Sequence, residues 1–153
     1  MHYQLPPWFG LTLTVVVCGA AFWKGARDEQ VAAAGVVLSW LATLVLHDPH
    51  WIGPQWGAFG ADVLLLFLIV AVALRSERYW PMVAAAFQLL CVTIHLARLF
   101  DPGVRAWAYA TGQVIFTHFY LWTIAFAVWG TWRRRTRQLG TIEPTAAPGA
   151  TRR

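Results

Sequence analysis

Charged and amide side chains lie inside long apolar stretches of this sequence, and they are its candidates for chemistry. An ionisable residue in an apolar span is costly, and it usually faces the interior of a helical bundle, where it pairs, binds or conducts. The residues that we single out on this ground are Asp62, Arg98, His95, His47 and Gln88. Three of them, Gln88, His95 and Arg98, are separated by seven and three residues, which places them on one face of a helix.

Two other stretches carry polar stripes with a similar spacing. One holds Ser39, Thr43 and His47, and the other holds Gln113, Thr117 and Tyr120 with His118 beside them. If all the stripes turn inward, a bundle of these helices contains a polar, hydrogen-bonded seam. The alternative is that the hydroxyl groups bond to carbonyls of their own helix and the amides make ordinary contacts between helices.

Asp62 and Arg98 are the two residues most worth testing, and a pair between them is geometrically possible since both fall toward the same side of the membrane. Such a pair is either a structural ion pair or part of a binding site, and the sequence leaves both interpretations open. Together with His95 and His47, the pair would line a pathway for a small molecule or an ion.

The histidines allow a second kind of site. His95 and His118 on neighbouring helices could ligate a b-type haem, and His47, His50 and His95 could bind a metal ion with Asp62. The spacing gives this idea little support, because the chain has no HExxH and no CxxCH motif. We therefore predict no cofactor, with haem b or a metal ion as the alternative.

Helices that cross a membrane must position these side chains. Hydrophobic residues make up 58% of the 153 residues and charged residues 12%, whereas soluble domains carry about 25% charged residues. Crossing about 30 Å of hydrocarbon takes roughly 20 apolar residues. Five stretches qualify, at about 5–23, 30–46, 56–74, 80–99 and 106–132. We predict an all-α polytopic bundle of five transmembrane helices over residues 1–137, with the first helix peripheral, and a disordered tail over 138–153.

The basic residues indicate how this bundle is oriented. With the N-terminus outside, ten of the twelve Lys and Arg residues fall on the inner side, and only Arg98 and Arg105 fall outside. The net charge of +5 therefore reflects topology and anionic lipid, and we expect no binding of nucleic acid. The expected topology has the N-terminus outside and the C-terminus in the cytoplasm.

Recognisable catalytic motifs are missing from the sequence. It has no Walker loop, no dinucleotide fingerprint and no GxSxG. Cys18 and Cys91 lie in different spans, where we expect them to pack as small apolar residues. These observations lean against an enzyme.

Three segments carry a resemblance: HDPHWIGPQWG at 47–57, RSERYWPMVAAAFQLL at 75–90 and DPGVRAWAYA at 101–110. On these segments the chain resembles small multi-pass inner-membrane proteins of alphaproteobacteria, of the sphingomonad type, over most of residues 1–132. The resemblance implies a bacterial inner-membrane location with a periplasmic N-terminus, and it assigns no catalytic residue.

Three functions fit these observations. The first is an accessory or structural subunit that joins other membrane-protein subunits, or copies of itself, in the lipid bilayer. The second is a small-molecule or ion pathway through the polar seam. The third is a membrane protein that transfers electrons through a haem or metal held by the histidines.

Overall fold

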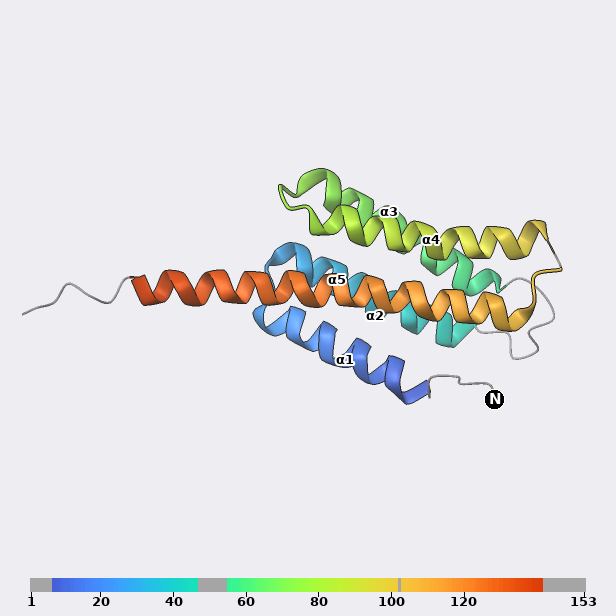
Figure 1. The fold of residues 1–153 in the computed structure, drawn as a ribbon, viewed down its shortest axis with the longest axis horizontal. Helices are drawn as coiled ribbons and strands as arrows, with labels where there is room; N and C mark the ends of the chain where they lie inside the picture. Colours follow the sequence, from blue (N-terminus) through green and yellow to red (C-terminus); the bar gives the residue numbers. More distant parts are fainter. Residues whose placement is uncertain (1–6, 47–54, 102, 142–153) are drawn as a thin grey trace, which may run out of the picture.

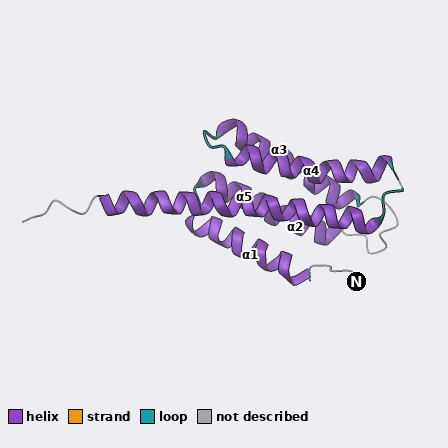
Figure 2. Ribbon diagram, viewed as in Figure 1, coloured by secondary structure: helices purple, strands orange, loops and turns teal. Residues whose placement is uncertain are grey.

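The computed structural model describes residues 7–46, 55–101 and 103–141, and every regular element in these ranges is a helix (Figures 1 and 2). The helices are α1 (Pro7–Lys24), α2 (Arg27–Leu46), α3 (Trp56–Arg75), α4 (Trp80–Phe100) and α5 (Ala106–Thr141). The all-α prediction is confirmed, and four of the five predicted starts fall within two residues of the observed ones. The exception is α2, which begins three residues before its predicted start. The Glu29 carboxylate caps it there by accepting from the backbone N–H of Ala26.

The outer surface of the bundle suits hydrocarbon better than water. Helices α2, α3, α4 and α5 are long and apolar enough to cross a membrane, and α1 is an apolar helix of slightly shorter length. Large apolar side chains point outward on several helices, with Val45, Leu74 and Phe100 each more than four-fifths exposed. A soluble monomer rarely exposes apolar surface on this scale, so the fold is compatible with a membrane protein.

The five helices form a closed ring in chain order. Each helix packs against the next, α5 returns to α1, and α2 also contacts α5 across the ring. Figure 1 shows α3 and α4 on one side of α5 and α1 on the other. Helix α1 was expected to be peripheral; it packs on α2 and α5 and contributes Val17, Cys18 and Ala21 to the core. The small residues around Cys18 allow this close approach.

The two ends of the bundle differ in charge and packing. We call the end where α1 stops and α2 starts the basic end, and the opposite end the cavity end. The basic end carries Lys24, Arg27, Arg75, Arg78 and Arg133. The hydrophobic core lies toward this end and at mid-height, where fully buried alanines such as Ala32, Ala33 and Ala84 let the helices pack closely.

Helix α5 is much longer than a single membrane crossing needs. Its 36 residues span about 54 Å at 1.5 Å per residue, and Figure 1 shows it extending past the other helices at the basic end. The helix continues to Thr141, four residues into the segment predicted to be a disordered tail. An arginine-rich run ends the apolar span without ending the helix, because Arg and Gln are good helix formers in water.

Candidate functional site

The carboxylate of Asp62 on α3 is held by side chains from two other helices. Gln88 on α4 donates from Nε2 to Oδ1 at 3.0 Å and to the backbone oxygen of Asp62 at 3.1 Å. His95 on α4 and Gln113 on α5 lie against the second carboxylate oxygen, with their Nε2 atoms at 3.0 Å and 3.2 Å. Gln88 and His95 are almost fully buried. Asp62 therefore joins α3, α4 and α5, although α3 and α5 do not otherwise pack on each other in the described residues.

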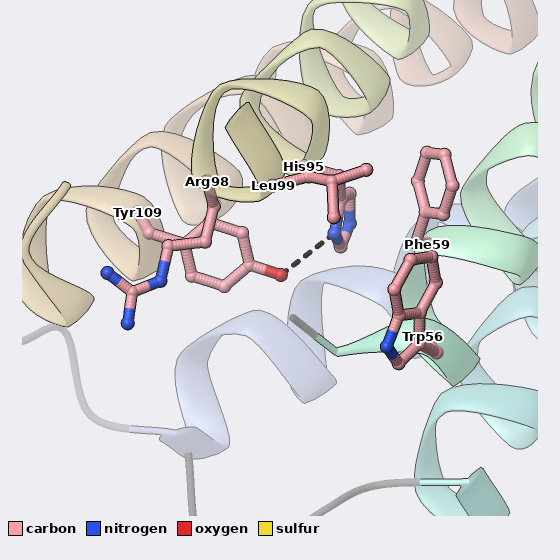
Figure 3. A pocket seen from close by; sticks show the side chains of 6 residues that line it. All are labelled: Trp56, Phe59, His95, Arg98, Leu99 and Tyr109. Carbon is pink, nitrogen blue, oxygen red and sulfur yellow. Dashed lines mark hydrogen bonds between the residues drawn. The ribbon is translucent and has the colours of Figure 1, made fainter. Parts of the chain in front are cut away.

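The hydrogen-bond chain continues from His95 to Tyr109 on α5. The Tyr109 hydroxyl lies 2.8 Å from Nδ1 of His95 (Figure 3), and Gln113 also contacts the histidine through Nε2. Both ring nitrogens of His95 are therefore in hydrogen-bond contact, Nδ1 with the Tyr109 hydroxyl and Nε2 with the Asp62 carboxylate. We call Asp62, Gln88, His95, Tyr109 and Gln113 the polar network.

Helical periodicity explains how the sequence assembles the polar network. Gln88 and His95 are seven residues apart on α4, and Tyr109 and Gln113 are four residues apart on α5, so each pair shares a helix face. Asp62 lies in the second turn of α3, at the same height in the bundle. The predicted seam is therefore present, and it is supplied mainly by α3, α4 and α5.

A large cavity lies beside the polar network and is bounded by all five helices. Its volume is about 570 Å³. Each of the five helices contributes at least one polar side chain to its wall. The polar residues that line it are Thr14, Ser39, Thr43, Gln55, Asp62, Gln88, His95, Tyr109, Gln113, Thr117, His118 and Tyr120. The stripes predicted on the second and fifth spans both face this space through their described residues. Trp40, near mid-height on α2, is also part of the wall.

Three of the lining side chains have a buried polar atom without a hydrogen-bond partner in the described part of the chain. These atoms are Oε1 of Gln113, Nε2 of His118 and the hydroxyl of Tyr120. Buried polar groups are nearly always satisfied, so each exception needs an explanation such as a bound molecule or water. All three belong to α5, and the three atoms themselves have almost no accessible surface.

A second, much smaller pocket adjoins His95 and Tyr109. Its volume is about 10 Å³, and Trp56, Phe59, His95, Arg98, Leu99 and Tyr109 line it (Figure 3). His95 and Tyr109 also line the large cavity, whereas Arg98 is not among its described lining residues.

The predicted ion pair between Asp62 and Arg98 is wrong for the described structure, because Asp62 pairs with His95 instead. Arg98 Nη1 donates to the backbone oxygen of Val104 in the turn between α4 and α5. The reason is depth: Arg98 follows His95 by three residues, so it lies about 4.5 Å further along the axis of α4 than the imidazole.

The histidines do not form the predicted haem or metal site among the described residues. Both ring nitrogens of His95 contact protein groups. His118 donates from Nδ1 to the backbone oxygen of Val114 at 2.6 Å and stacks on Phe9 of α1, with ring centroids 5.7 Å apart. No group of three metal-ligating side chains occurs in residues 7–46, 55–101 and 103–141. His47 and His50 lie outside these ranges, so the metal hypothesis that uses them stays a prediction.

A buried ion pair at the basic end is the main polar feature that the sequence analysis missed. Glu29 on α2 is fully buried and lies 2.5 Å from Nη1 of Arg78, in the turn between α3 and α4. Thr131 on α5 donates to Glu29 and accepts from Arg78, each at 2.8 Å. We call Glu29, Arg78 and Thr131 the basic-end clamp.

The sequence did contain a signal for this clamp. Glu29 is the third residue of α2, and its carboxylate also accepts from the backbone N–H of Ala26 at 2.9 Å. An acidic residue three positions after the N-cap is a capping pattern, and it marks the start of a helix instead of a loop. Recognising this pattern would have placed Glu29 inside the bundle, where a charge needs a partner.

Comparison of the chain with protein-family models, with curated proteins and with solved structures returns no match. The class is therefore defined by the fold and the site alone. The chain is a ring of five helices, four of them able to cross a membrane, around a cavity with a buried polar network.

Proposed function

We propose that this chain is an integral protein of a bacterial inner membrane that binds a small molecule in the cavity between its five helices. The cavity carries the proposal. Its volume of about 570 Å³ falls in the range of roughly 300–1,000 Å³ that is typical of ligand sites. Its wall combines apolar surface with convergent polar groups, which is the usual composition of such sites.

A purely structural bundle has no reason to keep such a space. Helices in membranes associate by close packing, and a cavity forfeits the dispersion contacts of the atoms that line it. The same chain packs tightly toward the basic end, where Ala32, Ala33 and Ala84 are fully buried. The hollow half is therefore not a general consequence of this composition, and a ligand that fills it supplies the missing contacts.

An accessory role in a larger membrane assembly, the first expectation from the sequence, is compatible with ligand binding. A subunit of an assembly can also hold a small molecule. The part of α5 that extends past the other helices presents an exposed arginine-rich surface from Arg133 to Arg137, which is available to a neighbouring protein or to lipid. The binding of a small molecule is the more specific proposal, because a defined cavity supports it.

The proposed orientation puts the basic end in the cytoplasm and the cavity end toward the periplasm. Positively charged residues favour the cytoplasmic side of bacterial membrane proteins. The described basic residues at the basic end outnumber the two at the cavity end, Arg98 and Arg105. A ligand would then reach the cavity from the outer half of the membrane.

A matched pair of substitutions on α5 tests whether the cavity holds a molecule. Ala110 lines the cavity, and Ala108, two residues earlier, is exposed and does not line it. The Ala110→Phe variant fills part of the cavity, and Ala108→Phe adds the same volume outside it. Each protein is purified in mild detergent, extracted with organic solvent, and analysed by mass spectrometry for small molecules present in stoichiometric amounts.

The expected result is a molecule that accompanies the wild type and Ala108→Phe and is depleted from Ala110→Phe. Identical extracts from all three proteins, or no stoichiometric molecule in any of them, would count against the proposal. The result does not depend on knowing the ligand in advance.

Cysteine labelling tests the orientation. The native Cys18 and Cys91 are buried, so the background is low. A membrane-impermeant maleimide added to spheroplasts should modify Ala106→Cys at once and Glu77→Cys only after the membrane is permeabilised. Labelling of both positions from the same side would overturn the proposed topology.

A further inference from the structure

One carboxylate lines the described part of the cavity. It belongs to Asp62, and no lysine or arginine is among the described lining residues. The ionisable group paired with Asp62 there is His95. Arg98 lines the small pocket and is not among the described residues that line the cavity. Acidic character therefore distinguishes this part of the cavity wall.

The Asp62 carboxylate keeps accessible surface in spite of its contacts. Gln88, His95 and Gln113 lie against its two oxygens, and the side chain is still 22% exposed. A further hydrogen-bond donor can therefore reach this carboxylate from the cavity, which it lines.

Aromatic rings add a third feature with the same preference. Trp40, Tyr109 and Tyr120 all line the cavity. The faces of such rings attract cations, most strongly where water is excluded.

We propose that the cavity binds a protonated organic amine, with Asp62 as its counter-ion. This inference rests on the proposed function, since it names the ligand class of the same cavity. It assigns Asp62 a role in binding in addition to its contacts with α4 and α5.

Three probes that share a phenylalkyl chain and differ in the head group test the sign of the charge. They are 4-phenylbutylammonium, 4-phenylbutanol and 5-phenylpentanoate. Binding of tritiated 4-phenylbutylammonium to the purified full chain in detergent is measured at pH 7, and the unlabelled probes compete for it. The variants are Asp62→Asn and, as the matched control at the basic end, Asp28→Asn, whose carboxylate accepts from Ser76 and does not line the cavity.

We expect the ammonium probe to bind at least about tenfold more tightly than the alcohol, and the carboxylate to bind most weakly. Asp62→Asn should reduce the ratio between ammonium and alcohol to about one, and Asp28→Asn should leave it unchanged. If Asp62→Asn does not fold, the relative affinities of the three probes for the wild type alone decide whether the inference holds.

Two results would overturn the inference while leaving the proposed function intact. One is equal binding of the alcohol and the ammonium to the wild type, and the other is tightest binding of the carboxylate. Failure of all three probes to bind also overturns the inference. The proposed function falls with it only if the solvent extracts of the wild type and Ala110→Phe are identical as well.

Discussion

Removing the Glu29 side chain should destabilise the protein more than removing any exposed carboxylate. Glu29 is fully buried and accepts hydrogen bonds from Arg78, from Thr131 and from the backbone N–H of Ala26. Breaking a buried ion pair by deleting one partner costs about 3–5 kcal/mol. The Arg78 side chain is 32% exposed, so water can solvate its charge once the Glu29 carboxylate is removed. The expected loss of unfolding free energy is therefore at the lower end of this range, about 3 kcal/mol.

Two variants of Glu29 should lose different amounts of stability. Glu29→Ala loses every bond of the carboxylate, and for a chain of this size a loss of about 3 kcal/mol lowers the melting temperature by about 6–12 °C. Glu29→Gln keeps an oxygen that can accept from Ala26, so it should lose only about 1–2 kcal/mol. The measurement is thermal unfolding in detergent, followed by fluorescence-detected size exclusion, with Glu77→Ala as the control. Glu77 is exposed and lies in the turn that also contains Arg78.

The reasoning is refuted if Glu29→Ala unfolds within about 0.5 kcal/mol of Glu77→Ala, because that is the usual scatter of surface substitutions. It is also refuted if Glu29→Gln is as unstable as Glu29→Ala. In that case the charge, and not the set of hydrogen bonds, would account for the whole effect, and the capping contact would contribute nothing.

Two further pairs of substitutions should change stability in opposite directions. Tyr120→Phe removes a buried hydroxyl that has no partner in the described residues and should be neutral or stabilising by up to about 1 kcal/mol, whereas Tyr109→Phe loses the bond to His95 and should cost about 0.5–1.5 kcal/mol. Both are measured by thermal unfolding without ligand, and a larger loss for Tyr120→Phe would contradict the description of the cavity. Gly25→Ala places a Cβ 2.4 Å from a backbone oxygen and should lose about 1–3 kcal/mol, whereas Gly19→Ala meets nothing within 4 Å and should gain up to about 1 kcal/mol in its helix. The same unfolding assay checks them, and equal effects would show that the turn between α1 and α2 relaxes freely.

Hydropathy predicted the helices well because a membrane span must be both helical and apolar. It located four of the five starts and missed features that do not depend on apolar character. Helix α2 begins at Arg27 because a capping contact of Glu29 extends it, and α5 continues to Thr141 because a basic run can stay helical in water. Hydropathy marks where a chain leaves hydrocarbon, and a helix can continue past that point.

The polar network was partly predictable for a similar reason. The spacing of Gln88 and His95 shows that they share a face, and it cannot show which helix that face meets. The sequence therefore suggested Arg98 as a partner of Asp62 from charge and expected depth, whereas the observed partner is His95. Tyr109 was not singled out, since a tyrosine near the start of a span is expected to lie at the membrane interface.

The contrast between the two halves of the bundle indicates where function resides. At the basic end, alanines pack closely. The buried carboxylate of Glu29 is bonded there by Arg78, Thr131 and the backbone N–H of Ala26, as stability requires. Toward the cavity end, the same five helices enclose open space and leave Gln113, His118 and Tyr120 each with an unsatisfied buried atom. Unsatisfied buried groups and lost packing both lower stability, and real proteins break these rules mainly at functional sites. A molecule bound beside Asp62 would contact the described walls of the cavity, and it would thereby restore the packing that this half of the bundle lacks.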